Sequence, residues 1–256
     1  MEATVLILKR EFQDQKEKIN IYFEHLKEYD SQDGLIGDKI VINTTQKSSA
    51  ILILYNIIES IVSRLLGKIH DKIMNETILY HEFNDNLRRT IFIFYKKILD
   101  ENNIDKNHKS MEVFYFLING KNKIKLTYNF MVETYQLFNG NLDAKEIRSV
   151  FKNKYGFEFN ENELKEPVLK RIREGRNNLA HGDQSFEEYG RNLTIQDIVA
   201  MKDKVFSFLD RLIEKVEIYL TKQLYKKLEL REELHFAGFK AVGESVAFLL
   251  FELVKP

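Results

Sequence analysis

The chain has 256 residues, no cysteine, and 39 basic side chains balanced by 39 acidic ones. The lack of cysteine excludes disulfides, thiolate nucleophiles and cysteine-bound zinc, and the neutral balance excludes a global positive field that would bind nucleic acid non-specifically. With 44% hydrophobic residues, the chain can bury a large core, so we expect it to need no metal and no cofactor.

The sequence carries no sign of export or membrane insertion. Residues 1–4 lack the basic and apolar regions of a signal peptide, and we expect no apolar run of the roughly 20 residues that span a bilayer. We therefore expect a soluble, cytoplasmic protein with no membrane partner.

Few residues interrupt helices, because the chain holds only two prolines and eleven glycines. The predicted fold class is all-α, an antiparallel helical bundle with additional helices and room for one small strand pair. Helical spacing of apolar residues predicts a first helix over residues 4–29. Residues 30–43 are predicted to form a loop, in which 39–43 could be a short strand.

The next helix is predicted to open among Thr44, Thr45 and Ser48, which are good N-cap residues. Its wide apolar face marks it as the central core helix; that face comprises Ile51, Leu54, Ile57, Ile58, Ile61, Leu65, Leu66 and Ile69. Residues 87–99 are predicted to be helical, and residues 100–110 to be a polar connection.

Local end signals define the later helices. Asp143 with Glu146 predicts a helix that ends at Gly156, Pro167 opens another that ends at Gly182, and Thr194 with Asp197 begins a long one. Residues 243–254 are predicted to form a final apolar helix. With no repeat or linker in view, we expect one helical domain over residues 1–230 and a helical extension over 231–256 packed on it.

One stretch suggests chemistry: Arg176-Asn177-Asn178-Leu179-Ala180-His181-Gly182. The arginine–histidine spacing is weak by itself, because Arg64 and His70 match it too, about 240° apart around their helix. Arg176 and His181 would be about 140° apart, but Gly182 should end their helix and free His181 from strict helical phase. The two asparagines are poor helix formers without a packing role, which is unusual at the end of a structural helix.

This stretch resembles the R-x4-6-H signature of the HEPN superfamily. Residues 55–60, 140–148 and 185–194 also resemble the full-length HEPN proteins of prokaryotic toxin–antitoxin and defence operons, so the resemblance covers roughly residues 1–230. It implies a helical bundle, a homodimer, and metal-independent cleavage of RNA at a site built by the motifs of both protomers. It further implies a toxin or anti-phage effector with a cognate antitoxin protein as partner.

The motif residues suit that chemistry. RNA cleavage without a metal requires a group that deprotonates the 2′-hydroxyl and protonates the leaving oxygen, and His181 is the candidate. Arg176 would bind the phosphoryl oxygens, and Asn177 would orient His181 or the phosphate. Lys170, Arg171 and Arg173 are candidates for binding the RNA backbone.

Two other functions fit the same sequence. The pocket could hold RNA or a nucleotide without cleaving it, as inactive members of the superfamily resemble the active ones in fold. The chain could also be an antitoxin or scaffold subunit, an alternative that its neutral net charge leaves open.

Overall fold

The computed structural model describes residues 2–31, 36–76, 78–100, 117, 127–135, 137–138 and 141–229. These residues confirm the all-α fold: apart from an isolated bridge between Phe83 and Lys226, they form no β-structure. Besides a single 3-10 turn at Tyr80–Glu82, the helices are α1 (Glu2–Asp30), α2 (Asp38–Asn75), α3 (Asp85–Asp100), α5 (Tyr128–Tyr135), α6 (Ala144–Tyr155), α7 (Pro167–His181), α8 (Phe186–Arg191) and α9 (Ile195–Thr221).

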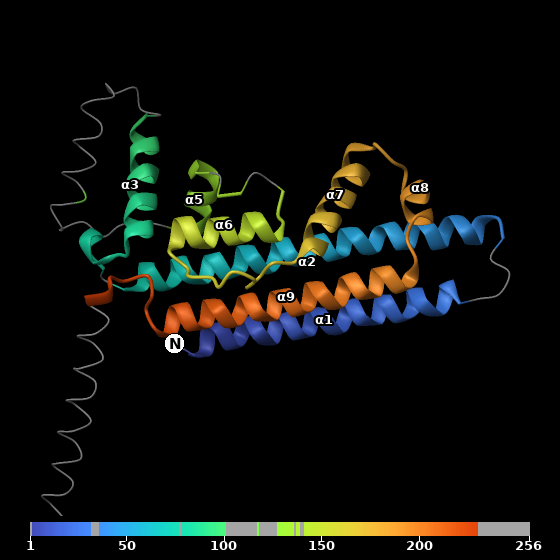
Figure 1. Ribbon diagram of the computed structural model, residues 1–256, viewed down its shortest axis with the longest axis horizontal. Coiled ribbons are helices and arrows are strands. Elements are labelled where there is room, and N and C mark those ends of the chain that lie inside the picture. Colours follow the sequence, from blue (N-terminus) through green and yellow to red (C-terminus); the bar gives the residue numbers. More distant parts are fainter. Residues whose placement is uncertain are drawn as a thin grey trace, which may run out of the picture.

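Helix α2 is the centre of the bundle. In Figure 1, α1 and α9 lie along one side of it, and α6, α7 and α8 lie on the other. All eight apolar residues predicted for its core face are buried. α2 also passes a test of length and hydropathy for a membrane span, contrary to the sequence expectation, but 56% of its most apolar 18-residue stretch is buried inside the bundle. The pattern agrees with the core helix of a soluble protein.

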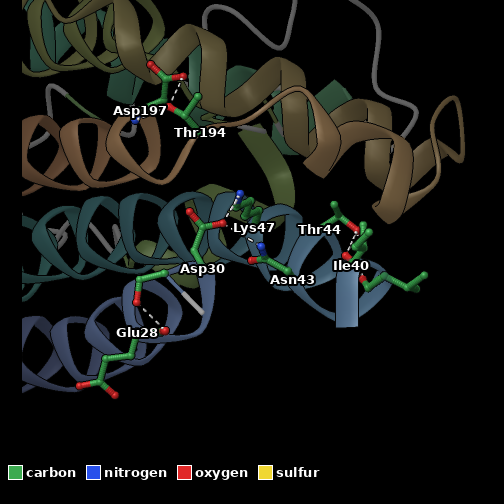
Figure 2. A network of polar contacts seen from close by, with 10 residues as sticks. Glu28, Asp30, Ile40, Asn43, Thr44, Lys47, Thr194 and Asp197 are labelled. Atoms are coloured by element: carbon green, nitrogen blue, oxygen red, sulfur yellow. Dashed lines mark hydrogen bonds and ion pairs between the residues drawn. The ribbon is translucent and has the colours of Figure 1, made fainter. Parts of the chain in front are cut away.

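The start of α2 differs from the prediction. The helix begins at Asp38, so residues 39–43 are helical and form neither a loop nor a strand, and Thr44 lies inside the helix. Figure 2 shows that the Thr44 hydroxyl donates back to the Ile40 carbonyl, at 2.9 Å, instead of capping. Tertiary contacts outweigh the strand propensity of this β-branched run, because the first turns of α2 bond to the end of α1.

Asp30 at the end of α1 makes these bonds. Its carboxylate accepts from the Asn43 amide at 2.7 Å and pairs with the Lys47 ammonium at 2.5 Å (Figure 2). Partial burial alone would raise the pKa of the Asp30 carboxyl, but the bonds from Asn43 and Lys47 outweigh it and hold that pKa below its ordinary value. The ionised Asp30 therefore fixes the end of α1 against the start of α2.

The predicted ends of α6, α7 and α9 are confirmed. The Asp143 side chain accepts from the Glu146 N–H, and the Thr194 side chain accepts from the Asp197 N–H. α6 ends at Gly156 and α7 at Gly182, both in the left-handed conformation. Such caps depend on neighbouring residues alone, which makes them readable from sequence.

The helix predicted over residues 87–99 is confirmed by α3. The polar connection is predicted over 100–110; Asp100 is the last residue of α3, and residues 101–110 lie outside the described residues. The final helix over 243–254 and the extension over 231–256 also lie outside them. The division into one domain over 1–230 and that extension stays a prediction.

Helix α8 packs directly on the backbone of α2 through Gly190. A Cβ added at this buried glycine would lie 1.9 Å from the carbonyl oxygen of Thr44, and a main-chain atom cannot move aside alone. The glycine therefore allows α8 to pack closely on α2. A short segment, residues 182–185, joins α8 to the C-terminal end of α7.

We expect Gly190→Ala to lower the free energy of unfolding by about 3 kcal/mol, because two backbone segments must separate. Gly67→Ala is the matched control, since Gly67 is helical and has no atom within 4 Å of an added Cβ. That variant should be neutral or stabilised by up to about 1 kcal/mol. Urea unfolding followed by circular dichroism measures both, and equal stability of the two variants would contradict the packing described for Gly190.

Candidate active site

The candidate residues lie on the second half of α7. Leu169, Ile172 and Leu179 face the core, and a buried Gly175 allows close approach of Tyr189 from α8, whose hydroxyl would lie 2.1 Å from an added Cβ. Figure 1 shows α7 leaving α2 as it runs toward its C-terminal end, where the connection to α8 begins. The end of α7 is thus presented at the surface while its inner face is anchored.

Arg176 is half-buried and contacts Tyr55 and Asn177. The Cζ atom of its guanidinium lies 4.4 Å from the centroid of the Tyr55 ring on α2. Its Nη1 donates to the Oδ1 atom of Asn177 at 2.9 Å. Tyr55 is itself buried, and its hydroxyl accepts from the Leu142 N–H at 3.3 Å. The planar guanidinium is therefore oriented by an aromatic ring that cannot readily move.

Asn177 connects Arg176 to the segment before α6. Its Nδ2 atom donates to the Oδ1 atom of Asn141 at 2.8 Å, while its oxygen accepts from Arg176. Both ends of the amide are thus used, which fixes the orientation of the side chain. In this arrangement Asn177 orients the arginine directly.

His181 is the last residue of α7 and is exposed. Within the described part of the chain, no hydrogen bond or ion pair holds its imidazole. Gly182 follows in the left-handed conformation and donates its N–H to the Asn178 carbonyl, which closes the helix. Since His181 stays helical, it remains about 140° around the axis from Arg176. The two side chains do not share one face of α7, so release from helical phase, as expected from sequence, does not occur.

The three candidates for RNA binding have different surroundings. Lys170 is exposed, and its ammonium lies 3.7 Å from a carboxylate oxygen of Glu174. Arg173 is half-buried and forms an ion pair with Asp143, the cap of α6. Arg171 is exposed and does not line the cavity that Lys170 and Arg173 share. The structure brings Lys170 and Arg173 together and leaves Arg171 apart.

The second arginine–histidine match has a structural role. His70 is fully buried, and its Nε2 lies 2.8 Å from the Tyr155 hydroxyl. Burial raises the pKa of that hydroxyl well above its ordinary value, so Tyr155 remains a neutral hydrogen-bonding group. Arg64 pairs at the surface with Glu11. His70 therefore serves packing and Arg64 makes a surface ion pair, so this second match does not form a site.

Two residues of the site had no role in the sequence analysis. The Tyr55 ring makes a cation–π contact with Arg176, and Asn141 bonds to Asn177. Both lie in segments that resemble HEPN proteins, residues 55–60 and 140–148, and this was the only sequence signal that pointed to them. Their contacts cross between helices and cannot be deduced from spacing.

An all-α bundle that presents Arg176, Asn177 and His181 at one helix end has the fold and motif of the HEPN class. A comparison with family models agrees: the model described as HEPN_MAE_28990-like HEPN matches residues 5–225. The chain belongs to this family of the HEPN superfamily. No curated protein and no solved structure gave a significant match.

Proposed function

We propose that the protein is a metal-independent endoribonuclease. Membership of the HEPN superfamily supports a nuclease or RNA-related role. The observation that carries the proposal further is the end of α7, where an arginine oriented by Tyr55 and Asn177 stands on the same helix end as an exposed histidine. These are the kinds of group that RNA cleavage without a metal requires.

In the proposed reaction, the 2′-oxygen attacks the adjacent phosphorus and the bond from phosphorus to the 5′-oxygen breaks. The products are a 2′,3′-cyclic phosphate and a 5′-hydroxyl end. A histidine accepts the proton of the 2′-hydroxyl, and a histidine donates one to the leaving 5′-oxygen. Arg176 donates two parallel hydrogen bonds to the phosphoryl oxygens and stabilises the charge that develops on them.

We propose further that the site is completed by a second copy of the chain. One imidazole cannot readily be acid and base in the same step, whereas a two-fold axis beside α7 would supply a second His181. The exposure of His181 suits this arrangement, and the angle between Arg176 and His181 within one chain is then no obstacle.

In the cell, the proposed protein is a toxin or anti-phage effector that cuts cellular RNA in the cytoplasm and is restrained by a cognate antitoxin protein. This part of the proposal follows the resemblance to HEPN proteins of toxin–antitoxin and defence operons. Genes beside that of the chain would identify the antitoxin.

The proposal predicts that purified protein cuts RNA in excess EDTA and leaves cyclic or 3′-phosphate ends. An all-deoxy strand of the same sequence should remain intact, because it lacks the attacking 2′-hydroxyl. Gel electrophoresis and mass spectrometry of the fragments measure both results. Cleavage of the all-deoxy strand, or dependence on a divalent ion, would exclude this mechanism; tight binding of RNA without cleavage would assign the chain to the binding-only members.

A further inference from the structure

A cavity of about 580 Å³ opens between the first turns of α6 and α7. Its lining is strongly basic, because five cationic side chains face two carboxylates there. The cationic side chains are Lys145, Arg148, Lys165, Lys170 and Arg173.

The two carboxylates of the cavity are already bound to the protein. Asp143 accepts from the Glu146 N–H and pairs with Arg173, and Glu166 accepts from the Val168 N–H. These bonds also cap the starts of α6 and α7, so the anion-binding capacity of the cavity comes from side chains and not from free helix ends. Glu174, outside the lining, lies 3.7 Å from Lys170, so among the described residues Lys145 and Lys165 are the lysines of this lining without an acidic partner.

Lys145 and Lys165 are exposed cations at this cavity. Neither makes an ion pair or side-chain hydrogen bond to another residue in the described ranges. Arg148 donates only to backbone carbonyls, those of Asn160 and Glu161, at 3.5 and 3.4 Å. Lys145 and Lys165 are therefore without a carboxylate partner among the described residues, which favours a ligand that carries several negative charges.

Helix α7 connects the cavity to the motif. Lys170 and Arg173 line the cavity, and Asn177 and His181 follow Arg173 at four-residue steps, so they lie along the same stripe of the helix. The distance from Lys170 to His181 along the axis is about 16 Å at 1.5 Å per residue. A ligand that occupies both places must be longer than a single nucleotide.

We propose that this cavity binds the sugar–phosphate backbone of the RNA next to the bond that is cut. The inference rests on the proposed function, because it assigns to the same substrate a second contact region along α7. Among the described residues that line the cavity there is no aromatic side chain on which a base could stack. The cavity therefore contacts phosphates regardless of sequence, and it adds affinity for longer strands without selecting bases.

The test uses the full chain and 2′-O-methyl RNA, which binds but cannot undergo 2′-hydroxyl attack. The double variant Lys145→Ala/Lys165→Ala removes the two exposed cations that have no partner. The control, Lys18→Ala/Lys204→Ala, removes two exposed lysines from α1 and α9, on the other side of α2. Binding is measured by fluorescence anisotropy with a dinucleotide and with a strand of roughly a dozen nucleotides.

We expect the cavity variant to bind the longer strand about 10-fold more weakly than wild type, with a shallower dependence on salt, because about 0.7 is lost from the log–log slope per phosphate contact. Its affinity for the dinucleotide should not change, and the control should bind both probes like wild type. Equal losses in the two double variants, or no loss in the cavity variant, would overturn the proposal. Tight binding of ATP that depends on Lys145 and Lys165, with RNA binding unchanged, would overturn it in favour of a free nucleotide.

Cleavage of unmodified RNA by the same preparations separates this inference from the proposed function. Wild-type protein that binds the longer strand through the cavity but does not cut would refute the nuclease and leave the cavity assignment standing. If the wild-type protein cuts RNA but the cavity variant binds RNA as tightly as wild type does, the cavity assignment alone is refuted.

Discussion

Replacing His181 by alanine is expected to slow RNA cleavage by about 100- to 10,000-fold, the contribution typical of a general acid or base. The imidazole is exposed and makes no bond within the described residues, so its removal should change the free energy of unfolding by less than about 0.5 kcal/mol. Single-turnover cleavage with enzyme in excess measures the rate of the chemical step.

His25→Ala is the control for this variant, because His25 is an exposed histidine on α1, away from α7. It should cut RNA at the wild-type rate. Circular dichroism and sedimentation should show unchanged helicity and association state for both variants. A His181→Ala protein that cuts at the wild-type rate would exclude the histidine from the reaction and with it the proposed mechanism.

Replacing Arg176 by alanine is expected to reduce cleavage by about 100- to 1,000-fold, the loss typical when one donor to a developing oxyanion is removed. Arg176→Lys should recover only a small part of the rate. Lysine keeps the charge but presents no planar fork to the phosphoryl oxygens and cannot reproduce the guanidinium that lies over Tyr55 and is bonded to Asn177.

Arg176 is half-buried, so its loss also affects stability, by about 1 kcal/mol through the contact with Tyr55. Urea unfolding of the same variants shows whether the protein is folded under the assay conditions. Arg211→Ala, which removes an exposed arginine from α9, should leave the rate unchanged. Full activity of Arg176→Lys would show that charge alone is enough and would contradict the oriented guanidinium.

The parts of the fold that sequence predicted well are those decided by adjacent residues. Asp143 and Thr194 begin their helices and Gly182 ends one, each through a hydrogen bond to a residue three or four positions away. Their effect on the helix ends is therefore independent of the rest of the chain. The start of α2 was predicted wrongly for the opposite reason. Residues 39–43 favour a strand locally, but bonds from Asn43 and Lys47 to Asp30 hold this part of the chain as a helix.

The residues of the candidate site also divide into those that the sequence could identify and those that it could not. Arg176, Asn177 and His181 are adjacent in sequence and could be named from it, whereas Tyr55 and Asn141 reach them only through packing of α2 and the start of α6 against α7. The basic cavity could not be predicted as a cavity, because its lining comes from the first turns of two helices. Sequence identified Lys170 and Arg173 as cations without showing that Arg173 is bound to Asp143.

The same bonds connect the fold to the proposed chemistry. Asp143 caps α6 and holds Arg173, and Asn141 beside it holds Asn177, which in turn orients Arg176. The segment before α6 thus fixes the inner half of the motif, while His181 stays free at the helix end. A rigid arginine with an accessible histidine suits the proposed site, in which a second protomer would supply the other histidine.

The central claim is that the motif on α7 cuts RNA. Inducing wild-type protein and His181→Ala side by side in cells, at matched protein levels, and sequencing all RNA ends tests it most directly. We expect new ends at discrete positions, with 5′-hydroxyl and cyclic or 3′-phosphate termini, in cells that make the wild-type protein and not in cells that make the variant. Identical end profiles in the two cultures would contradict it.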